Sequence, residues 1–145
     1  MKKLASALII CLITALPLRA EGLETDIIVA GENVALEEYR WTNRPLVVFA
    51  DSPNDPRFVQ QMEYINDQIE ALALRDVIVL TDTDPSARGP LRQDLRPHGF
   101  MLVLVDKNGN IALRKPSPWD VREISRSIDK MPLRQQEIRE ETRGN

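Results

Sequence analysis

The chain has 145 residues, 28% of them charged, and a formal net charge of −3 at pH 7. This length is typical of a single domain, and the acidic balance argues against non-specific binding to nucleic acid. The sequence contains one cysteine, Cys11.

The first twenty residues have the layout of a secretory signal peptide. Two lysines precede an apolar run from 4 to 16, Pro17 breaks that run, and Ala20 provides a small residue at the expected cleavage site. The run is shorter than the ~20 residues that a membrane span needs. We therefore expect cleavage after Ala20, export to the periplasm or beyond the cell, and no stable membrane anchor in the mature chain.

Cleavage would remove Cys11 together with three of the 19 basic residues. The mature chain would then have 16 basic residues against 22 acidic ones, a net charge of −6. Thiol–disulfide chemistry requires a thiolate nucleophile. The mature chain is therefore predicted to have no thiol redox activity, and the absence of a stray thiol suits an oxidising compartment.

Residues 21–35 form a polar extension with one apolar island at 27–29. Asn33 is a suitable N-cap for a short helix that reaches about Arg40. The next segment, "PLVVFA" (45–50), is a continuous apolar run. It predicts a central strand that is covered on both faces.

Asp55 and Pro56 predict the start of a long helix, because aspartate accepts from free backbone N–H groups and proline fits the first helical position. Apolar residues then recur at helical spacing: Phe58, Met62, Ile65, Ile69 and Leu72. The segment "DVIVLTD" (76–82) predicts a second buried strand. Strand, helix and strand together indicate a parallel βαβ unit.

Residues 83–99 are predicted to form a loop with a short helix around 91–95. Arg88, Arg92 and Arg96 recur every four residues. Such a row on one helical face could bind an anionic partner, but an ordinary solvated face is the favoured interpretation.

Residues 100–115 predict a β-hairpin with its turn at Asn108-Gly109. The last main helix is expected to begin at Ser117-Pro118, with Asp120 three residues after Ser117. Its inner face is predicted to contain Val121, Ile124, Ile128 and Met131. Residues 132–145 are highly polar, and we expect them to trail off as a C-terminal tail.

The predicted order of elements resembles the thioredoxin fold, with a central mixed sheet of about four strands and helices on both faces. "LVVFADSPNDP" resembles the thioredoxin strand that leads into a Cys-x-x-Cys loop, and "GFMLVLVDKNGNI" resembles the later strand and its turn. In this alignment Pro53 and Pro56 replace the two cysteines, and Met101 replaces the cis-proline. The resemblance covers 36–131, and it implies the fold without the redox chemistry.

A narrower resemblance rests on three segments: "YRWTNRPLVVFA", "LRDVIVL" and "IDKMPLRQQEIRE". These are similar to an exported bacterial, thioredoxin-like family called domain of unknown function 4174. The resemblance implies a fold and a compartment, and it carries over no catalytic residue.

The thioredoxin-like topology would bring several polar side chains to one edge of the sheet. Asp51, Asp55, Asp82, Asp84 and His98 could gather there, and such groups suit a metal or acid–base site. Local roles compete with this interpretation, because Asp55 is a predicted helix cap and aspartates before Pro85 commonly shape turns. We therefore predict no catalytic residue, no metal site and no cofactor. The predicted binding edge consists of Asp51, Ser52, Asn54, Asp82, Asp84, Arg88 and His98.

The resulting hypothesis is an exported, cysteine-less binding or accessory module and not an enzyme. Its partner is unidentified, and an envelope protein or peptide is the kind expected. The alternative is an envelope enzyme, hydrolytic or metal-assisted, that uses the Asp/His cluster. A structural or stress-protective protein without a defined ligand is a third possibility.

Overall fold

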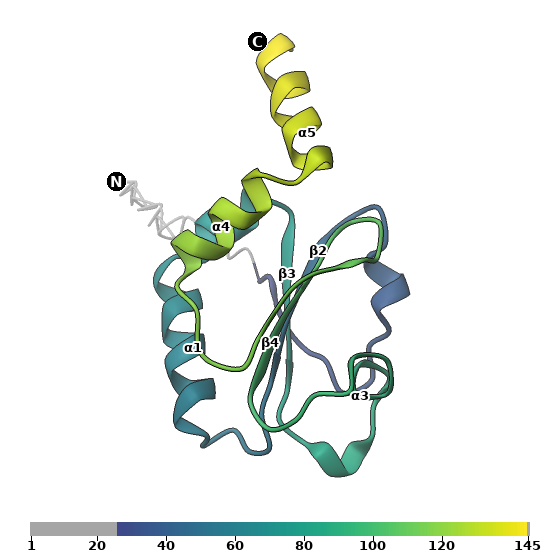
Figure 1. The fold of residues 1–145 in the computed structure, drawn as a ribbon, viewed down its shortest axis with the longest axis vertical. Coiled ribbons are helices and arrows are strands. Elements are labelled where there is room, and N and C mark those ends of the chain that lie inside the picture. The colour runs from purple at the N-terminus through teal and green to yellow at the C-terminus, as the bar shows by residue number, and fades with distance from the viewer. Residues whose placement is uncertain (1–25, 145) are drawn as a thin grey trace, which may run out of the picture.

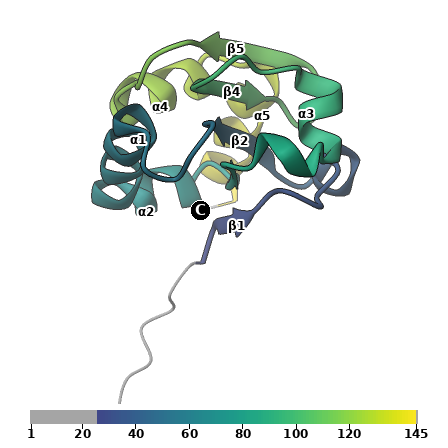
Figure 2. The same cartoon turned by 90° about the horizontal axis from the view of Figure 1, so that it is seen from below.

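The computed structural model describes residues 26–144, and the predicted signal peptide with Cys11 lies outside this part of the chain. Its centre is a five-stranded sheet in the order β1-β3-β2-β4-β5 (Figures 1 and 2). Strands β1, β3 and β2 run parallel to one another, β4 runs antiparallel to β2, and β5 runs antiparallel to β4. The strands are β1 (Ile28–Ala30), β2 (Arg44–Phe49), β3 (Val77–Asp82), β4 (Met101–Val105) and β5 (Ile111–Lys115).

The sheet has one strand more than the sequence predicts. The additional strand is β1, which comes from the apolar island and pairs with β3 from Ile28 opposite Val79 to Ala30 opposite Thr81. The sheet therefore begins before residue 36, the predicted start of the domain. A three-residue strand at a sheet edge carries too little alternation to be recognised without its partner.

Strand β2 is buried along its whole length, as its apolar run predicts. Successive side chains of a strand point to opposite faces. Leu46 and Val48 accordingly contribute to one core cluster, and Val47 and Phe49 contribute to another. The central position of β2 explains why it has no polar face.

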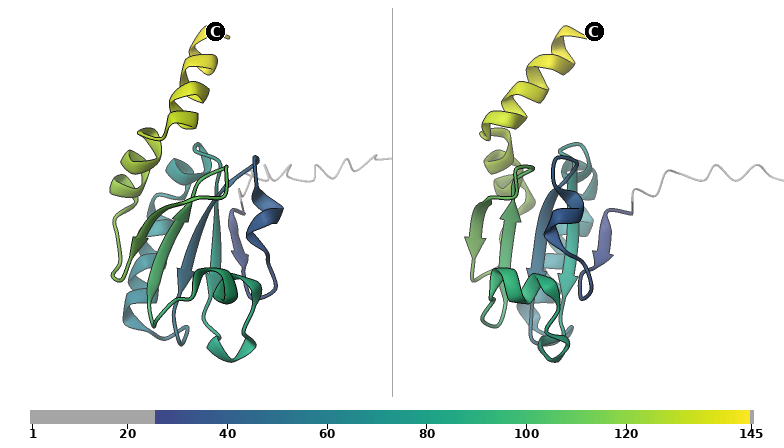
Figure 3. Two further views of the ribbon diagram at one scale, coloured as in Figure 1. Left: turned by 45° about the vertical axis from the view of Figure 1, so that its right-hand side comes forward. Right: turned by 90° about the vertical axis from the view of Figure 1, so that its right-hand side faces the viewer.

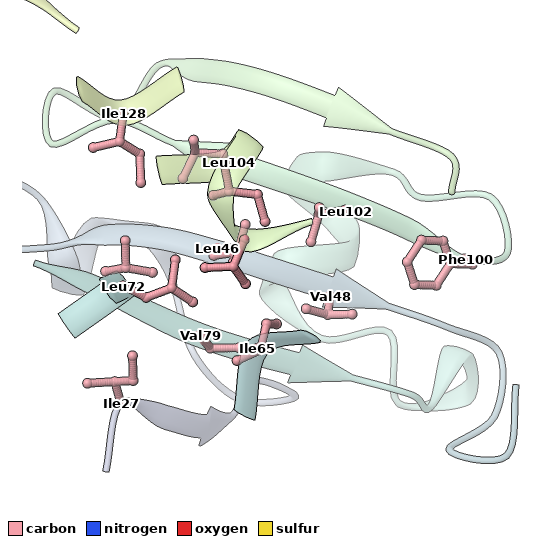
Figure 4. Close-up of a cluster of buried hydrophobic side chains, with 13 residues drawn as sticks. Ile27, Leu46, Val48, Ile65, Leu72, Val79, Phe100, Leu102, Leu104 and Ile128 are labelled. Atoms are coloured by element: carbon pink, nitrogen blue, oxygen red, sulfur yellow. The ribbon is translucent and has the colours of Figure 1, made fainter. Parts of the chain in front are cut away.

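Helices cover both faces of the sheet (Figure 2). One face carries α1 (Pro56–Asp67), α2 (Ile69–Ala73) and α4 (Val121–Asp129), whose apolar side chains pack on the larger core cluster (Figure 4). The other face carries α3 (Pro90–Leu95) and the short 3₁₀ helix η1 (Leu36–Tyr39). Helices on both faces of the sheet are as predicted.

The predicted long helix after Pro56 is divided in two. Gln68 has φ −134° and separates α1 from α2. The predicted apolar face nevertheless continues across the break, because Ile65 and Leu72 are fully buried and the other three members pack against the same cluster. The apolar spacing identified the buried face correctly but gave no sign of the break.

The hairpin and the last main helix agree with their predicted positions apart from one helix start. Gly109 adopts φ 90° in the turn between β4 and β5. Helix α4 begins after Asp120, whose side chain accepts a hydrogen bond from the Arg122 N–H at 2.7 Å. Asp120 therefore caps the helix in place of Ser117, and Val121, Ile124 and Ile128 are buried as expected.

The two tryptophans differ from each other. Trp119 is partly buried, and its backbone N–H and C=O both bond the side chain of the buried Gln61, at 2.7 and 3.0 Å. Trp41 is 66% exposed and has φ 68°, so its side chain does not pack in the core. A bulky side chain at positive φ is uncommon.

The polar segment after Met131 forms a helix, α5 (Pro132–Arg143), where the sequence predicts a trailing tail. The helix starts at one end of the sheet and projects away from the body of the domain (Figures 1 and 3). Within residues 26–144, no helix has the length and apolar character needed to cross a membrane.

Candidate functional site

The ends of three neighbouring strands meet at one edge of the sheet. Phe49, the last residue of β2, pairs with Asp82 at the end of β3 and with Met101 at the start of β4. The predicted juxtaposition of these segments is therefore correct. We call this part of the molecule the strand-end edge, and it comprises residues 50–57, 82–92 and 96–101.

The loop after β2 forms an open hollow of about 440 Å³. The loop is a compact turn, because the Asn54 N–H bonds the Ser52 hydroxyl oxygen at 3.1 Å and the Asp55 N–H bonds the Ser52 carbonyl at 3.2 Å. The lining residues are Asp51, Ser52, Asn54, Asp55, Pro56 and Arg57. Three of the predicted edge residues thus line one surface hollow.

Asp55 caps α1, as the sequence predicts. Its carboxylate accepts hydrogen bonds from the Arg57 backbone N–H at 2.9 Å and from Nε and Nη2 of the Arg57 guanidinium, at 3.2 and 2.9 Å. The side-chain hydrogen bond from Arg57 lowers the pKa of Asp55. Arg57 also lies 5.6 Å from the centre of the Phe100 ring. The positive end of the α1 dipole is therefore already occupied by a carboxylate of the chain itself.

Asp82 is fully buried. Its predicted place in the binding edge is therefore wrong. One of its carboxylate oxygens, Oδ1, accepts a hydrogen bond from Nε of Arg92 at 2.9 Å. Arg92 also donates to the Ala50 and Asp82 carbonyl groups, at 2.8 and 3.1 Å, and lies over the Phe49 ring. The pair ties α3 to the ends of β2 and β3, so its role is structural.

Asp84 remains at the surface. It begins the 3₁₀ helix η2 (Pro85–Ala87), and its carboxylate accepts from both the hydroxyl and the backbone N–H of Ser86. The hydroxyl hydrogen bond lowers the pKa of Asp84. Asp84 therefore shapes its turn, which is the local role anticipated for it.

The three arginines spaced by four do not share a helical face. Helix α3 contains Arg92 alone, while Arg88 and Arg96 lie at its two ends with φ 48° and 47°. Their left-handed backbone interrupts the helical period that the spacing assumes. Arg88 is exposed, and it stays a candidate contact residue.

His98 is also exposed and lies beside Gly99, which has φ 60°. A Cβ at Gly99 would lie 4.0 Å from a carboxylate oxygen of Asp51. The segment before β4 is therefore close to the loop after β2. In the described part of the chain, no three His, Cys, Asp or Glu side chains are grouped so that they could hold a metal ion.

A second polar site, at the opposite end of the sheet, escaped the sequence analysis. Arg44 at the start of β2 is 1% exposed, and its Nη2 donates to both carboxylate oxygens of Glu137 in α5, at 3.0 and 3.1 Å. Lys107 in the β4–β5 turn donates to the same carboxylate at 2.8 Å and to Asp76 at 2.7 Å. We call Arg44, Asp76, Lys107 and Glu137 the ionic cluster.

Further charged pairs surround the ionic cluster. Arg75 forms a two-pronged contact with Asp129 at 2.9 and 2.8 Å, and Arg134 contacts Glu137 at 3.2 Å. The three segments that carry the narrower family resemblance supply every one of these residues except Lys107. The sequence contains one sign of this site, because Arg44 directly precedes the apolar run 45–50. Nothing in the sequence identifies Glu137 as the partner of Arg44.

Glu137 is strongly stabilised in its ionised form. Burial raises its pKa, but hydrogen bonds from Lys107, Arg44 and Arg134 outweigh this effect and lower the pKa to about 2. Three cations on one carboxylate thus fix the first half of α5 against the sheet.

Known proteins match this chain in both sequence and fold. The family model described as "Domain of unknown function (DUF4174)" matches residues 35–137, a span that includes the ionic cluster. Coiled-coil domain-containing protein 80 of Danio rerio is 30% identical over 133 aligned positions, which cover 71% of this chain and 15% of that protein's length. This chain is thus similar to a small part of a much longer relative.

Two solved structures show the same fold. The reduced 2-Cys peroxiredoxin of Plasmodium vivax superimposes with a TM-score of 0.54 at 16% identity, over 70% of this chain and 84% of that one. The thioredoxin peroxidase I of Plasmodium yoelii gives a TM-score of 0.50 at 15% identity, over 71% and 80% of the two chains. At such identities the likeness establishes a thioredoxin-like fold only.

Proposed function

The chain belongs to the family described as Domain of unknown function (DUF4174), and from this premise we propose that its mature form is an exported, thioredoxin-like binding module without thiol redox activity. The observation that carries the proposal is the state of the α1 N-terminus. In redox relatives of this fold, the loop before this helix holds the reactive cysteines. Here an ion pair between Asp55 and Arg57 occupies the N-terminal end of α1, and no cysteine follows Cys11 in the sequence.

The strand-end edge is the proposed contact surface. Loops at strand ends can vary without disturbing the packed sheet, so folds of this kind commonly place their binding sites there. The hollow of about 440 Å³ beside Ser52 and Asn54 offers a concave surface, and His98 and Arg88 are exposed on adjoining segments. Asp82 is removed from the predicted set because it is buried. A protein or peptide of the cell envelope is the proposed partner.

The enzyme alternative has less support. Two of the carboxylates in the predicted Asp/His cluster already hold arginines, since Asp55 pairs with Arg57 and Asp82 pairs with Arg92. A general acid or base needs a carboxylate that is available to the substrate.

The proposal is tested by photo-crosslinking in cells that produce the protein, with a reactive group at Pro53, which is exposed in the loop. The edge variant replaces Ser52, Asn54 and His98 by alanine, and the matched control replaces the exposed Arg122 and Arg126 of α4. We expect a specific crosslinked partner whose yield falls about tenfold or more in the edge variant. Removal of side chains at the centre of an interface commonly weakens the binding affinity by about this much. The control variant should keep the yield. A partner that is lost with the α4 variant and retained with the edge variant would contradict the proposal.

A further inference from the structure

Helix α5 is attached to the domain chiefly through charge. Its sequence, "PLRQQEIREETR", contains only two large aliphatic residues, and its second half projects away from the sheet (Figure 3). A helix that is polar on all sides has no apolar stripe with which to pack. Hydrogen bonds from Arg44 and Lys107 join Glu137 to β2 and to the β4–β5 turn. The Gln135 amide donates to the Asp129 carbonyl of α4, and Arg134 lies 3.9 Å from the Asp129 carboxylate.

The cationic side of this attachment is built into the sheet. Arg44 belongs to β2, and its Nη1 donates to the Arg75 carbonyl at 2.9 Å, which fixes the guanidinium independently of α5. Lys107 is held by Asp76 at 2.7 Å. Planar guanidinium groups bind carboxylates with two parallel hydrogen bonds, and here one guanidinium nitrogen contacts both oxygens of Glu137. Both cations would stay in place if the helix moved away.

Removal of α5 would leave a site with a net positive charge. Arg134 and Glu141 contact each other within α5 and would depart together with Glu137. The remaining charges of the ionic cluster are those of Arg44 and Lys107 against the carboxylate of Asp76, while the nearby Asp106 carboxylate accepts the N–H groups of Asn108 and Asn110 in its own turn. A buried guanidinium that loses its partner is unfavourable, so such a site favours a replacement carboxylate.

Space for a second group exists beside the cations. A cavity of about 170 Å³ lies between the β4–β5 turn and the first turn of α5. Arg44 and Lys107 form part of its wall, and the remaining lining residues are Asp106, Asn108, Met131, Pro132 and Leu133. A competing carboxylate can therefore approach the cations next to Glu137.

We propose that Arg44 and Lys107 form a carboxylate-binding site, that Glu137 is its resident ligand, and that α5 is a strap which opens when another carboxylate replaces Glu137. This site lies at the opposite end of the sheet from the strand-end edge, so it does not depend on the function proposed above. The strap links occupancy of the site to the position of the C-terminal helix.

The test uses the full mature chain with Glu137→Ala, which empties the site but leaves the cations. Amide hydrogen exchange is measured in α5 and in β2, in acetate and in chloride at equal ionic strength. We expect exchange in α5 to become about tenfold faster or more, as for a locally opening unit, with little change in β2. In the wild type, acetate should speed exchange in α5 by displacing Glu137, whereas chloride should not; in the variant, whose α5 is already released, acetate should have no further effect. Glu140→Ala is the matched control, because Glu140 is exposed and contacts Gln136 of the same helix.

Two outcomes would overturn the proposal: unchanged exchange in α5 of the Glu137→Ala variant, or exchange in α5 of the wild type that is equal in acetate and in chloride. If the variant does not fold, the wild-type protein decides the matter. Its α5 amides should then exchange through an opening separate from unfolding of β2, and faster in acetate than in chloride. Exchange in α5 that occurs only with global unfolding, or that is the same in both salts, contradicts the strap.

Discussion

At the scale of single residues, two arginines hold the two ends of the sheet. Arg92 pairs with the buried Asp82 at the strand-end edge, and Arg44 pairs with Glu137 at the other end. The alternation of side chains along β3 gave a sign of the pair between Asp82 and Arg92. Leu80 packs on the face that α3 covers, and residues two apart in a strand share a face, so Asp82 points beneath α3 as well.

Arg92→Met should destabilise the protein strongly, because it leaves the fully buried Asp82 carboxylate without its cation. Breaking a buried ion pair in this way costs about 3–5 kcal/mol of unfolding free energy. Urea denaturation followed by circular dichroism measures the change. Arg88→Met, just before α3, is the matched control, and as a surface change it should stay within about 0.5 kcal/mol of the wild type.

The double variant Asp82→Leu with Arg92→Met provides the complementary measurement. It removes both charges, so no uncompensated carboxylate remains, and it should recover part of the lost stability. A double variant as unstable as the single one would show that the ion pair itself is not the reason for the loss.

At the scale of elements, local signals located helices well where a cap was present. Asp55 and Pro56 marked the start of α1, whereas the end at Gln68 had no glycine or proline to mark it. The start of α4 was misplaced by a few residues because Ser117 and Asp120 are both capping residues. Only the packed structure shows that Asp120 accepts the hydrogen bond from the first turn.

Asp55→Ala should lower the melting temperature by a few degrees, because it removes the cap of α1. Asp55→Asn should lose less, since asparagine also caps helices but cannot form the ion pair with Arg57. The pKa of Asp55 is lowered in the folded protein. Its contribution is therefore complete above the unfolded-state pKa of aspartate, and it is lost as the pH falls through the folded-state pKa.

Thermal melts of the three proteins at neutral and acidic pH measure both effects. The difference between the wild type and Asp55→Ala should shrink in acid. If Asp55→Ala melts like the wild type at neutral pH, the cap does not stabilise the helix, and Asp55 is better explained as a contact residue of the hollow.

At the scale of the whole molecule, the strand-end edge and the ionic cluster lie at opposite ends of the sheet, separated by the length of its strands. The strand-end edge lies where β2 and β3 end, and the ionic cluster lies where they begin (Figure 1). Two apolar layers, one on each face of the sheet, lie between them. A rigid packed core of this kind allows either end to bind without distortion of the other.

The mature protein should begin at Glu21 and contain no thiol, because cleavage after Ala20 removes Cys11. Intact-mass analysis of the exported protein, before and after treatment with a maleimide, measures both properties together. We expect the mass of residues 21–145 and no maleimide adduct. A mass that includes the first twenty residues, or a gain of one adduct, would contradict the predicted signal peptide.

The sequence by itself determined the thioredoxin-like fold, the central position of β2, the cap of α1 and the hairpin. The last three depend on residues that are close in the chain, so that periodicity and capping reveal them. The fold was inferred from the resemblance of the predicted order of elements to that of thioredoxin. Only the tertiary structure decided that Asp82 is buried against Arg92 and that α5 is held by Glu137. Glu137 lies 93 residues from Arg44. The charge of a residue does not specify which distant charge will meet it, because that depends on how the sheet and helices pack together.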